Sequence, residues 1–95
     1  MKKVHFPLTS SKPLPGDVEF AAKDTLRRYE GLFKNDPDIA GYTLAARDGD
    51  PYIQVFVKQG RARFVEGRIP DRLDDLDVYY LETSVRALGS GVAPR

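Results

Sequence analysis

The chain has 95 residues, of which 41% are hydrophobic and 31% charged, and its formal net charge is +1. These values are typical of one globular domain, and they exclude a largely disordered chain, a basic nucleic-acid-binding arm and an acidic tail. No apolar run approaches the roughly 18 residues of a membrane-spanning helix, and the lack of cysteine excludes disulfides, thiolate catalysis and Cys-ligated metal. We expect a cytoplasmic protein, because the sequence fits a reducing compartment and does not begin with a signal peptide.

The first sixteen residues predict a strand followed by a loop. Residues 1–6 predict a short edge strand through Val4 and Phe6, and Pro7 ends it. Residues 9–16 are rich in serine, proline and glycine, which is typical of a loop. Asp17 follows as the expected N-cap of a helix.

Residues 18–33 predict an amphipathic helix. Its apolar side chains recur at intervals of three or four positions, which places them on one face of a helix. This stripe consists of Val18, Ala22, Leu26, Tyr29 and Phe33. Phe20 lies off the stripe, and the Asn-Asp-Pro-Asp sequence at residues 35–38 ends the helix.

Residues 39–58 predict a β-hairpin, around which the rest of the domain is organised. Residues 39–46 and 52–58 alternate between two faces, and the turn formers of residues 47–51 separate them. The face formed by Ile53, Val55 and Val57 is the more apolar one of its strand, so we expect it to meet the helix. Tyr52 and Phe56 then lie on the opposite, open face.

The last third of the chain has a weaker pattern. Residues 59–68 predict a loop with at most one strand turn, and Ile69-Pro70 predicts a short helical turn that directs Leu73 and Leu76 to the core. Residues 77–83 predict a strand with Val78 and Tyr80 on one face, which residues 85–88 continue. Residues 89–95 predict a disordered tail.

These elements predict a two-layer α+β domain over residues 1–88. One main helix covers a three- or four-stranded, largely antiparallel sheet, because an isolated hairpin is marginal in water and must bury one face.

A series of short motifs supports this class from residue 39 onward. They are Ile39-Ala40-Gly41, Asp48-Gly49, Ile53-Gln54-Val55-Phe56-Val57, Ile69-Pro70 with Leu73 and Val78, Leu81-Glu82-Thr83, and Val85-Arg86-Ala87-Leu88. In this order they resemble a small, poorly characterised bacterial α/β domain, found free-standing or ahead of trypsin-like serine protease domains. Asp75 and Ser84 depart from that pattern, which has glycine at both positions. The resemblance covers about half the chain and implies a module without an active site of its own.

The sequence predicts neither an enzyme nor a cofactor. His5 is the lone histidine, and no serine has the setting of a hydrolase nucleophile, so His5 is interpreted as a surface histidine. Carboxylates cluster between residues 71 and 77, but they lack the spacing of a calcium loop. We interpret them as residues that cap and solvate a turn: Asp71, Asp74, Asp75 and Asp77.

Two binding hypotheses remain. The first is protein association, including a homodimer, through a strand edge or through the open sheet face with Tyr52, Phe56 and Tyr79. Association through the open face is excluded if the N-terminal segment or residues 59–68 cover those aromatic side chains. The alternative is weak binding of single-stranded nucleic acid by the loop of residues 61–72. Its four arginines are Arg61, Arg63, Arg68 and Arg72.

Overall fold

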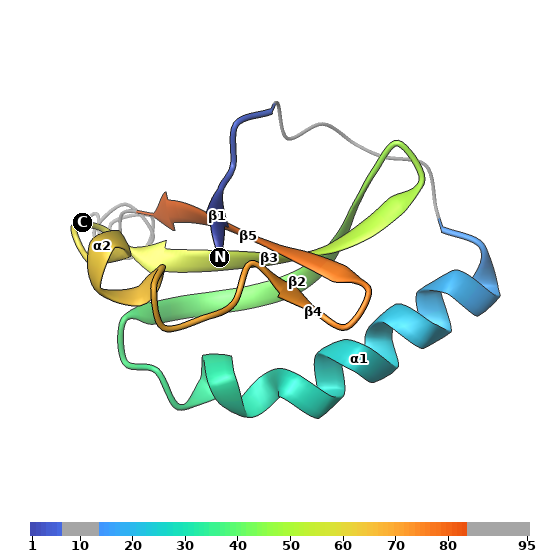
Figure 1. Ribbon diagram of the computed structural model, residues 1–95, viewed down its shortest axis with the longest axis horizontal. Helices are drawn as coiled ribbons and strands as arrows, with labels where there is room; N and C mark the ends of the chain where they lie inside the picture. Colours follow the sequence, from blue (N-terminus) through green and yellow to red (C-terminus); the bar gives the residue numbers. More distant parts are fainter. Residues whose placement is uncertain (7–13, 84–95) are drawn as a thin grey trace, which may run out of the picture.

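The computed structural model describes residues 1–6 and 14–83 and shows a two-layer α+β domain (Figure 1). The main helix, α1 (Gly16–Lys34), covers one face of a sheet that contains the long strands β2 (Ile39–Arg47), β3 (Asp50–Lys58) and β5 (Leu76–Thr83). Two-residue strands, β1 (Lys2–Lys3) and β4 (Arg72–Leu73), flank β5. The predicted fold class is therefore confirmed.

Helix α1 begins two residues before the predicted start. Pro15 occupies the N-cap position, and no side chain makes a capping hydrogen bond there, so the prediction that Asp17 caps the helix is wrong. Asp17 lies within the first turn, where its negative charge interacts favourably with the helix dipole. Phe20 is 72% exposed, as expected for a side chain that lies off the apolar stripe.

The hairpin of β2 and β3 is confirmed. Its loop consists of Asp48 and Gly49, which both have positive φ, at 51° and 85°. Positive φ at both central residues defines a type I′ turn, whose twist matches that of the two strands. The pairing keeps one register from Gly41 opposite Phe56 to Arg47 opposite Asp50, and it shifts only between Ile39 and Gly41.

The sheet is mixed and has five strands, two of them only two residues long, which refines the expectation of three or four largely antiparallel strands. The strand order is β1-β5-β3-β2, with β4 paired to β5. The central pair, β3 and β5, is parallel, and so are β1 and β5, whereas the two other pairs are antiparallel. Strand β2 therefore lies at one margin of the sheet, and its outer side pairs with no strand of the described chain.

The core lies between α1 and the sheet face predicted to meet it. Ile53, Val55 and Val57 are fully buried in it, together with Val78 of β5. Phe33 is 2% exposed and closes the core at the end of α1. The predicted division of β3 into a core face and an opposite face is thus confirmed.

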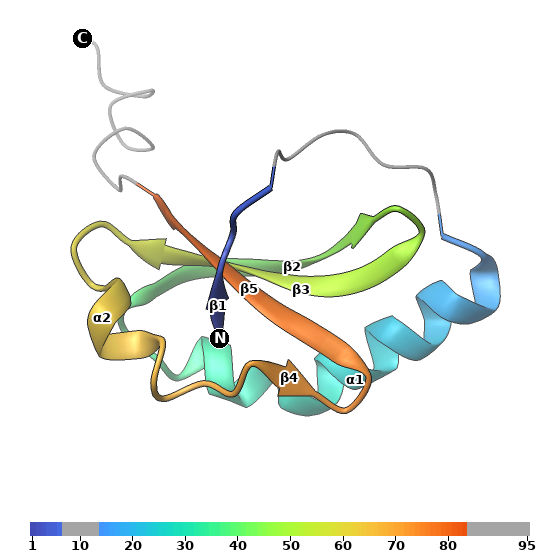
Figure 2. The same ribbon diagram turned by 45° about the horizontal axis from the view of Figure 1, so that its top comes forward.

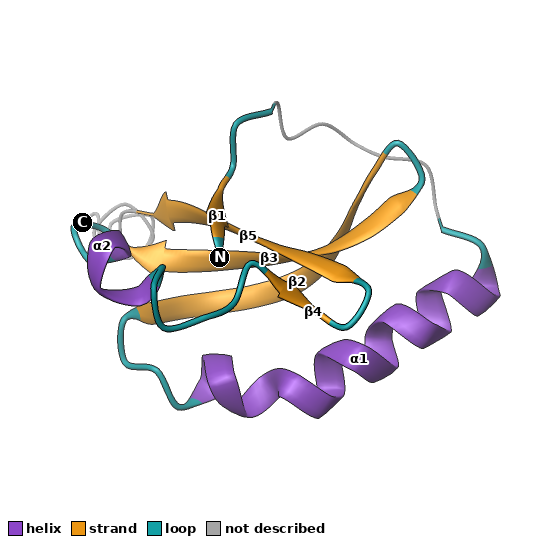
Figure 3. Cartoon of the chain, in the orientation of Figure 1, coloured by secondary structure: helices purple, strands orange, loops and turns teal. Residues whose placement is uncertain are grey.

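The segment between β3 and β5 differs from its prediction. Residues Ala62–Val65 form the short helix α2, not a strand turn, and Val65 is buried. Leu73 and Leu76 do reach the core, but Leu73 belongs to β4 and pairs with Leu76, so the predicted helical turn at Pro70 is wrong. Figure 3 shows α2 as the second helix of the described chain.

The N-terminal strand is shifted from its prediction, because it comprises Lys2 and Lys3, and Val4 adds a backbone hydrogen bond to Tyr80 of 2.9 Å. The predicted continuation at residues 85–88 and the predicted tail at residues 89–95 lie outside the described residues. Within the described ranges, no helix is long and apolar enough to cross a membrane.

Candidate association surface

The outer edge of β2 is the most distinctive surface of the described chain. Nine residues, Ile39–Arg47, form this strand, and Arg47 is its only charged residue. Natural edge strands usually avoid pairing with other chains by carrying lysine or proline, by being short or by containing a bulge. Here the only irregularity lies at the start, between Ile39 and Gly41, so the remainder of the edge is regular.

The turn determines which backbone groups of β2 point outward. In a two-residue turn, the carbonyl of Arg47 accepts a hydrogen bond from the amide of Asp50, so the polar backbone groups of Arg47 point toward β3. Direction alternates along an antiparallel ladder, so the amides and carbonyls of Tyr42, Leu44 and Ala46 point away from β3. Pro51, which has no amide hydrogen, lies opposite Ala46, as this pattern requires.

Helix α1 packs across β2 and β3, and one of its sides faces this edge strand. The Tyr42 hydroxyl donates a hydrogen bond of 2.6 Å to Glu30 Oε2, and the rings of Tyr42 and Phe33 have centroids 5.2 Å apart. The Tyr42 hydrogen bond lowers the pKa of Glu30 and raises that of Tyr42. Figure 2 shows α1 on one side of β2 and β3, while the N-terminal segment begins on that side, crosses β5 and continues on the other.

The sheet face opposite α1 is partly covered. Phe6 packs edge-on against Tyr52 and Tyr79, with centroids 5.6 Å and 5.1 Å away, and the Arg47 guanidinium lies 4.1 Å from the centre of the Phe6 ring. Tyr52 is consequently only 6% exposed, while Phe56 and Tyr79 are half-buried. The N-terminal segment thus covers part of this face, whereas α2 contributes Val65 to the core.

The same face contains a buried polar side chain, Gln54. It is 3% exposed, and its Nε2 donates to the Val55 carbonyl at 3.2 Å. Its Oε1 is buried and accepts no hydrogen bond from the described chain. Burying an amide oxygen without a donor is unfavourable, so Gln54 weakens the fold locally.

Replacing Gln54 with methionine is therefore expected to stabilise the domain. Gln54→Met keeps the length of the side chain and removes the unpaired oxygen, which should raise the free energy of unfolding by about 1 kcal/mol. Urea denaturation followed by circular dichroism measures this change. Destabilisation by 1 kcal/mol or more would show that the amide oxygen is well paired in solution.

The four arginines of the nucleic-acid hypothesis do not form one free basic patch. Arg61 and Arg68 lie together, but both bind Asp38, at 2.9 Å and 3.0 Å, and Arg68 also binds Asp36. The hydrogen bond from Arg61 and that from Arg68 lower the pKa of Asp38, although partial burial opposes the shift.

The other two arginines point elsewhere. Arg72 lies 3.8 Å from Asp77, and the Arg63 guanidinium lies 5.0 Å from the centre of the Phe64 ring. Of the four side chains, three are thus partly neutralised by carboxylates, which reduces the positive charge that this loop offers to phosphates.

The carboxylates of residues 71–77 separate in the structure. Asp71 pairs with the amino group of Met1 at 3.1 Å, Asp74 with Arg28 at 2.9 Å, and Asp77 with Lys2 at 3.4 Å. Tyr29 also donates a hydrogen bond of 2.9 Å to Asp74. In the parts of the chain that the structure describes, no group of three histidine, aspartate or glutamate side chains is placed to hold a metal ion.

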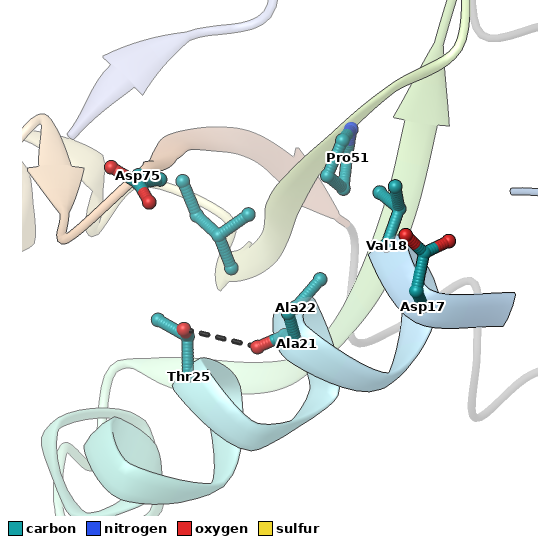
Figure 4. Close-up of a pocket in the computed structure, with 8 residues that line it drawn as sticks. Asp17, Val18, Ala21, Ala22, Thr25, Pro51 and Asp75 are labelled. Carbon is teal, nitrogen blue, oxygen red and sulfur yellow. Dashed lines mark hydrogen bonds between the residues drawn. The ribbon is translucent and has the colours of Figure 1, made fainter. Parts of the chain in front are cut away.

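A hollow of about 370 Å³ lies between the start of α1 and the strands (Figure 4). Aliphatic side chains line it, with Asp17 and Asp75 at its rim. The Thr25 hydroxyl, which also borders the hollow, donates a hydrogen bond of 3.1 Å to the Ala21 carbonyl. The hollow therefore combines apolar surface with two carboxylates, and its one hydroxyl is already engaged.

Comparisons with protein-family models, with curated proteins and with solved structures found no significant match to this chain.

Proposed function

We propose that this protein is a non-catalytic interaction module that associates with other protein chains, including its own copies, through the outer edge of β2. The observation that carries this proposal is the outer edge of β2, a regular strand with one charged residue that pairs with no strand among residues 1–6 and 14–83. The backbone groups of Tyr42, Leu44 and Ala46 provide alternating donors and acceptors there, which is the geometry that strand addition uses.

The edge is favoured over the open face because the face is already partly occupied. Phe6 covers Tyr52, so the exposed aromatic surface is reduced to Phe56 and Tyr79. The edge, by contrast, is continuous from Gly41 to Arg47 and pairs with no strand of the described chain. Pairing there extends the sheet without displacing Phe6.

A substitution at Ala46 tests the edge directly. Ala46→Pro removes one outward amide and places a ring where a pairing strand approaches, without removing a hydrogen bond to β3. Light scattering across a concentration series should show self-association in the wild type. The variant should associate about 30-fold more weakly or worse, so that it stays largely monomeric over the same concentrations. This estimate assumes that two symmetric hydrogen bonds of about 1 kcal/mol each are lost.

Two further variants serve as controls. Ala46→Val keeps the amide and favours strand conformation, so it should associate like the wild type. Phe20→Lys changes the most exposed large apolar side chain, on the outer side of α1, and should have no effect on association. A monomer at every concentration contradicts the proposal, as does association that Ala46→Pro leaves intact or that Phe20→Lys abolishes.

A further inference from the structure

The side of α1 that faces the β2 edge carries charges in a regular pattern. Glu30 is on this side, since it binds Tyr42, and side chains four, seven and eleven positions away lie on the same side of a helix. These side chains are Glu19, Lys23 and Lys34. From Glu19 to Lys34, the charges on this side of the helix therefore alternate between negative and positive. Within the helix, Glu19 pairs with Lys23 at 3.5 Å and Glu30 with Lys34 at 3.4 Å.

This row of four is complementary to itself when it is reversed. The centre of the row lies between Leu26 and Arg27. If a second α1 runs antiparallel to the first and the two rows share this centre, then Glu19 lies opposite Lys34 of the second copy. In the same arrangement Lys23 lies opposite Glu30 of the second copy. The four charges of this row then each lie opposite an opposite charge of the second copy, as an isologous interface with two-fold symmetry allows. Arg27, which is exposed on the same side of α1, lies opposite Leu26 of the second copy at the centre of the row.

Strand β2 has a centre of its own. Its regular part extends from Gly41 to Arg47, and the middle residue of this range is Leu44. Leu44 has outward-pointing backbone groups, so two β2 strands can pair antiparallel with Leu44 opposite Leu44. Tyr42 then lies opposite Ala46 of the second copy, and both residues also have outward-pointing groups, so the hydrogen bonds form in register.

The two centres lie at the same level. Tyr42 contacts Glu30 and Phe33, and β2 runs back along α1 from that point. The distance along β2 from Tyr42 to Leu44 is about 7 Å, which equals the length of about four or five residues of helix. Leu44 therefore lies level with Leu26 and Arg27. A single two-fold axis can therefore relate both the two β2 strands and the two α1 helices of the pair.

The spacing between the two helices also fits. Helix α1 packs on both β2 and β3, so its axis lies inside the β2 edge by about half of the spacing between strands. A two-fold axis half a spacing outside β2 then separates the two α1 axes by about 10 Å, a usual distance for packed helices. Leu26, Tyr42 and Leu44 are partly buried in one chain, and their exposed parts would meet near this axis.

We infer that the partner of the β2 edge is a second copy of this chain, paired antiparallel about Leu44, with the two α1 helices side by side in charge register. This inference rests on the proposed function, because it uses the same edge. It adds the identity of the partner, the register of the strands and the role of the α1 charges. The result is one continuous sheet across two chains, with both helices on the same face.

Charge reversal tests the helix register. Lys23→Glu places a negative charge opposite Glu30 of the second copy, and Glu30→Lys places a positive charge opposite Lys23. Each single variant should dimerise about three- to tenfold more weakly than the wild type, since exposed like-charge contacts cost up to about 1 kcal/mol. An equimolar mixture of the two variants restores opposite charges at both sites, so it should form a heterodimer with wild-type affinity.

Sedimentation equilibrium of each variant and of the mixture provides the measurement. Arg63→Glu, an equal charge change on α2, is the matched control and should dimerise like the wild type. Thermal unfolding by circular dichroism confirms that each monomer is folded, because Glu30→Lys also removes the acceptor of the Tyr42 hydroxyl.

The outcomes separate this inference from the proposed function. If the mixture dimerises no better than the single variants, or if neither single variant weakens the dimer, the register inferred here is wrong. The edge proposal survives that result if Ala46→Pro still disrupts the dimer. A wild type that remains monomeric overturns both, and so does an Ala46→Pro variant that still dimerises.

Discussion

Replacing Phe33 with alanine is expected to lower the free energy of unfolding by about 3–5 kcal/mol, the usual cost of removing a buried aromatic side chain. Phe33 is 2% exposed, and its ring lies against Tyr42 at the position where α1 contacts β2. Domains of this size are stable by about 5–15 kcal/mol in total, so the variant should be close to unfolding.

Phe20→Ala is the matched control, because it makes the same substitution in the same helix at a side chain that is 72% exposed. It should change stability by about 0.5 kcal/mol or less. Urea denaturation measures both variants. Equal losses of stability in the two would contradict the assignment of Phe33 to the core and of Phe20 to the outer side.

The domain is expected to lose stability at alkaline pH through Tyr80. Its hydroxyl donates a hydrogen bond of 2.7 Å to Glu66, and this bond, together with burial, raises the pKa of Tyr80 to about 12. In the unfolded chain the pKa is about 10. The folded state therefore keeps the proton more tightly, so its stabilisation is complete below pH 10 and decreases as the pH rises to about 12.

We expect about 1–2 kcal/mol of this alkaline loss to come from Tyr80. Two pKa units would correspond to about 2.7 kcal/mol, but Glu66 is exposed, and solvent screens part of the interaction. Tyr80→Phe should lower stability at neutral pH and make its decrease between pH 10 and 12 shallower, and Glu66→Gln should act similarly. Tyr29 and Tyr42, whose pKa values are also raised by carboxylate partners, should retain part of the slope. An unchanged slope in Tyr80→Phe would contradict this assignment.

Local patterns predicted the elements that local interactions form. Apolar residues at intervals of three or four positions identified the helix, and the alternation around Asp48-Gly49 identified the hairpin and the core face of β3. The turn requires positive φ at both of its central residues, and an Asp-Gly pair is among the few that adopt it readily. Neither inference needs contacts between distant parts of the chain.

The parallel pairing of β3 with β5 was not predictable in the same way. Parallel strands require a crossover, and the segment that provides it contains α2 and β4, which are only four and two residues long. Elements this short have no periodicity to detect. Val65 and Leu73 are buried because of tertiary packing, which overrides local preference.

The candidate site was only partly visible in the sequence. Tyr52 and Tyr79 do come together, with ring centroids 5.3 Å apart, but the arrival of Phe6 on this cluster depends on β1 pairing with β5. The alternation of Val4 and Phe6 in the sequence did indicate a strand in the N-terminal segment. The status of β2 as the edge strand, by contrast, follows from sheet order, which no local pattern specifies.

Amide hydrogen exchange of the wild-type protein at low and high concentration tests the central claim most directly. Tyr42, Leu44 and Ala46 should exchange quickly in dilute protein and become protected as the protein associates. The amides of Thr43 and Ala45 point toward β3 and should be protected at both concentrations. Association that leaves the exchange of Tyr42, Leu44 and Ala46 unchanged would contradict pairing through the β2 edge.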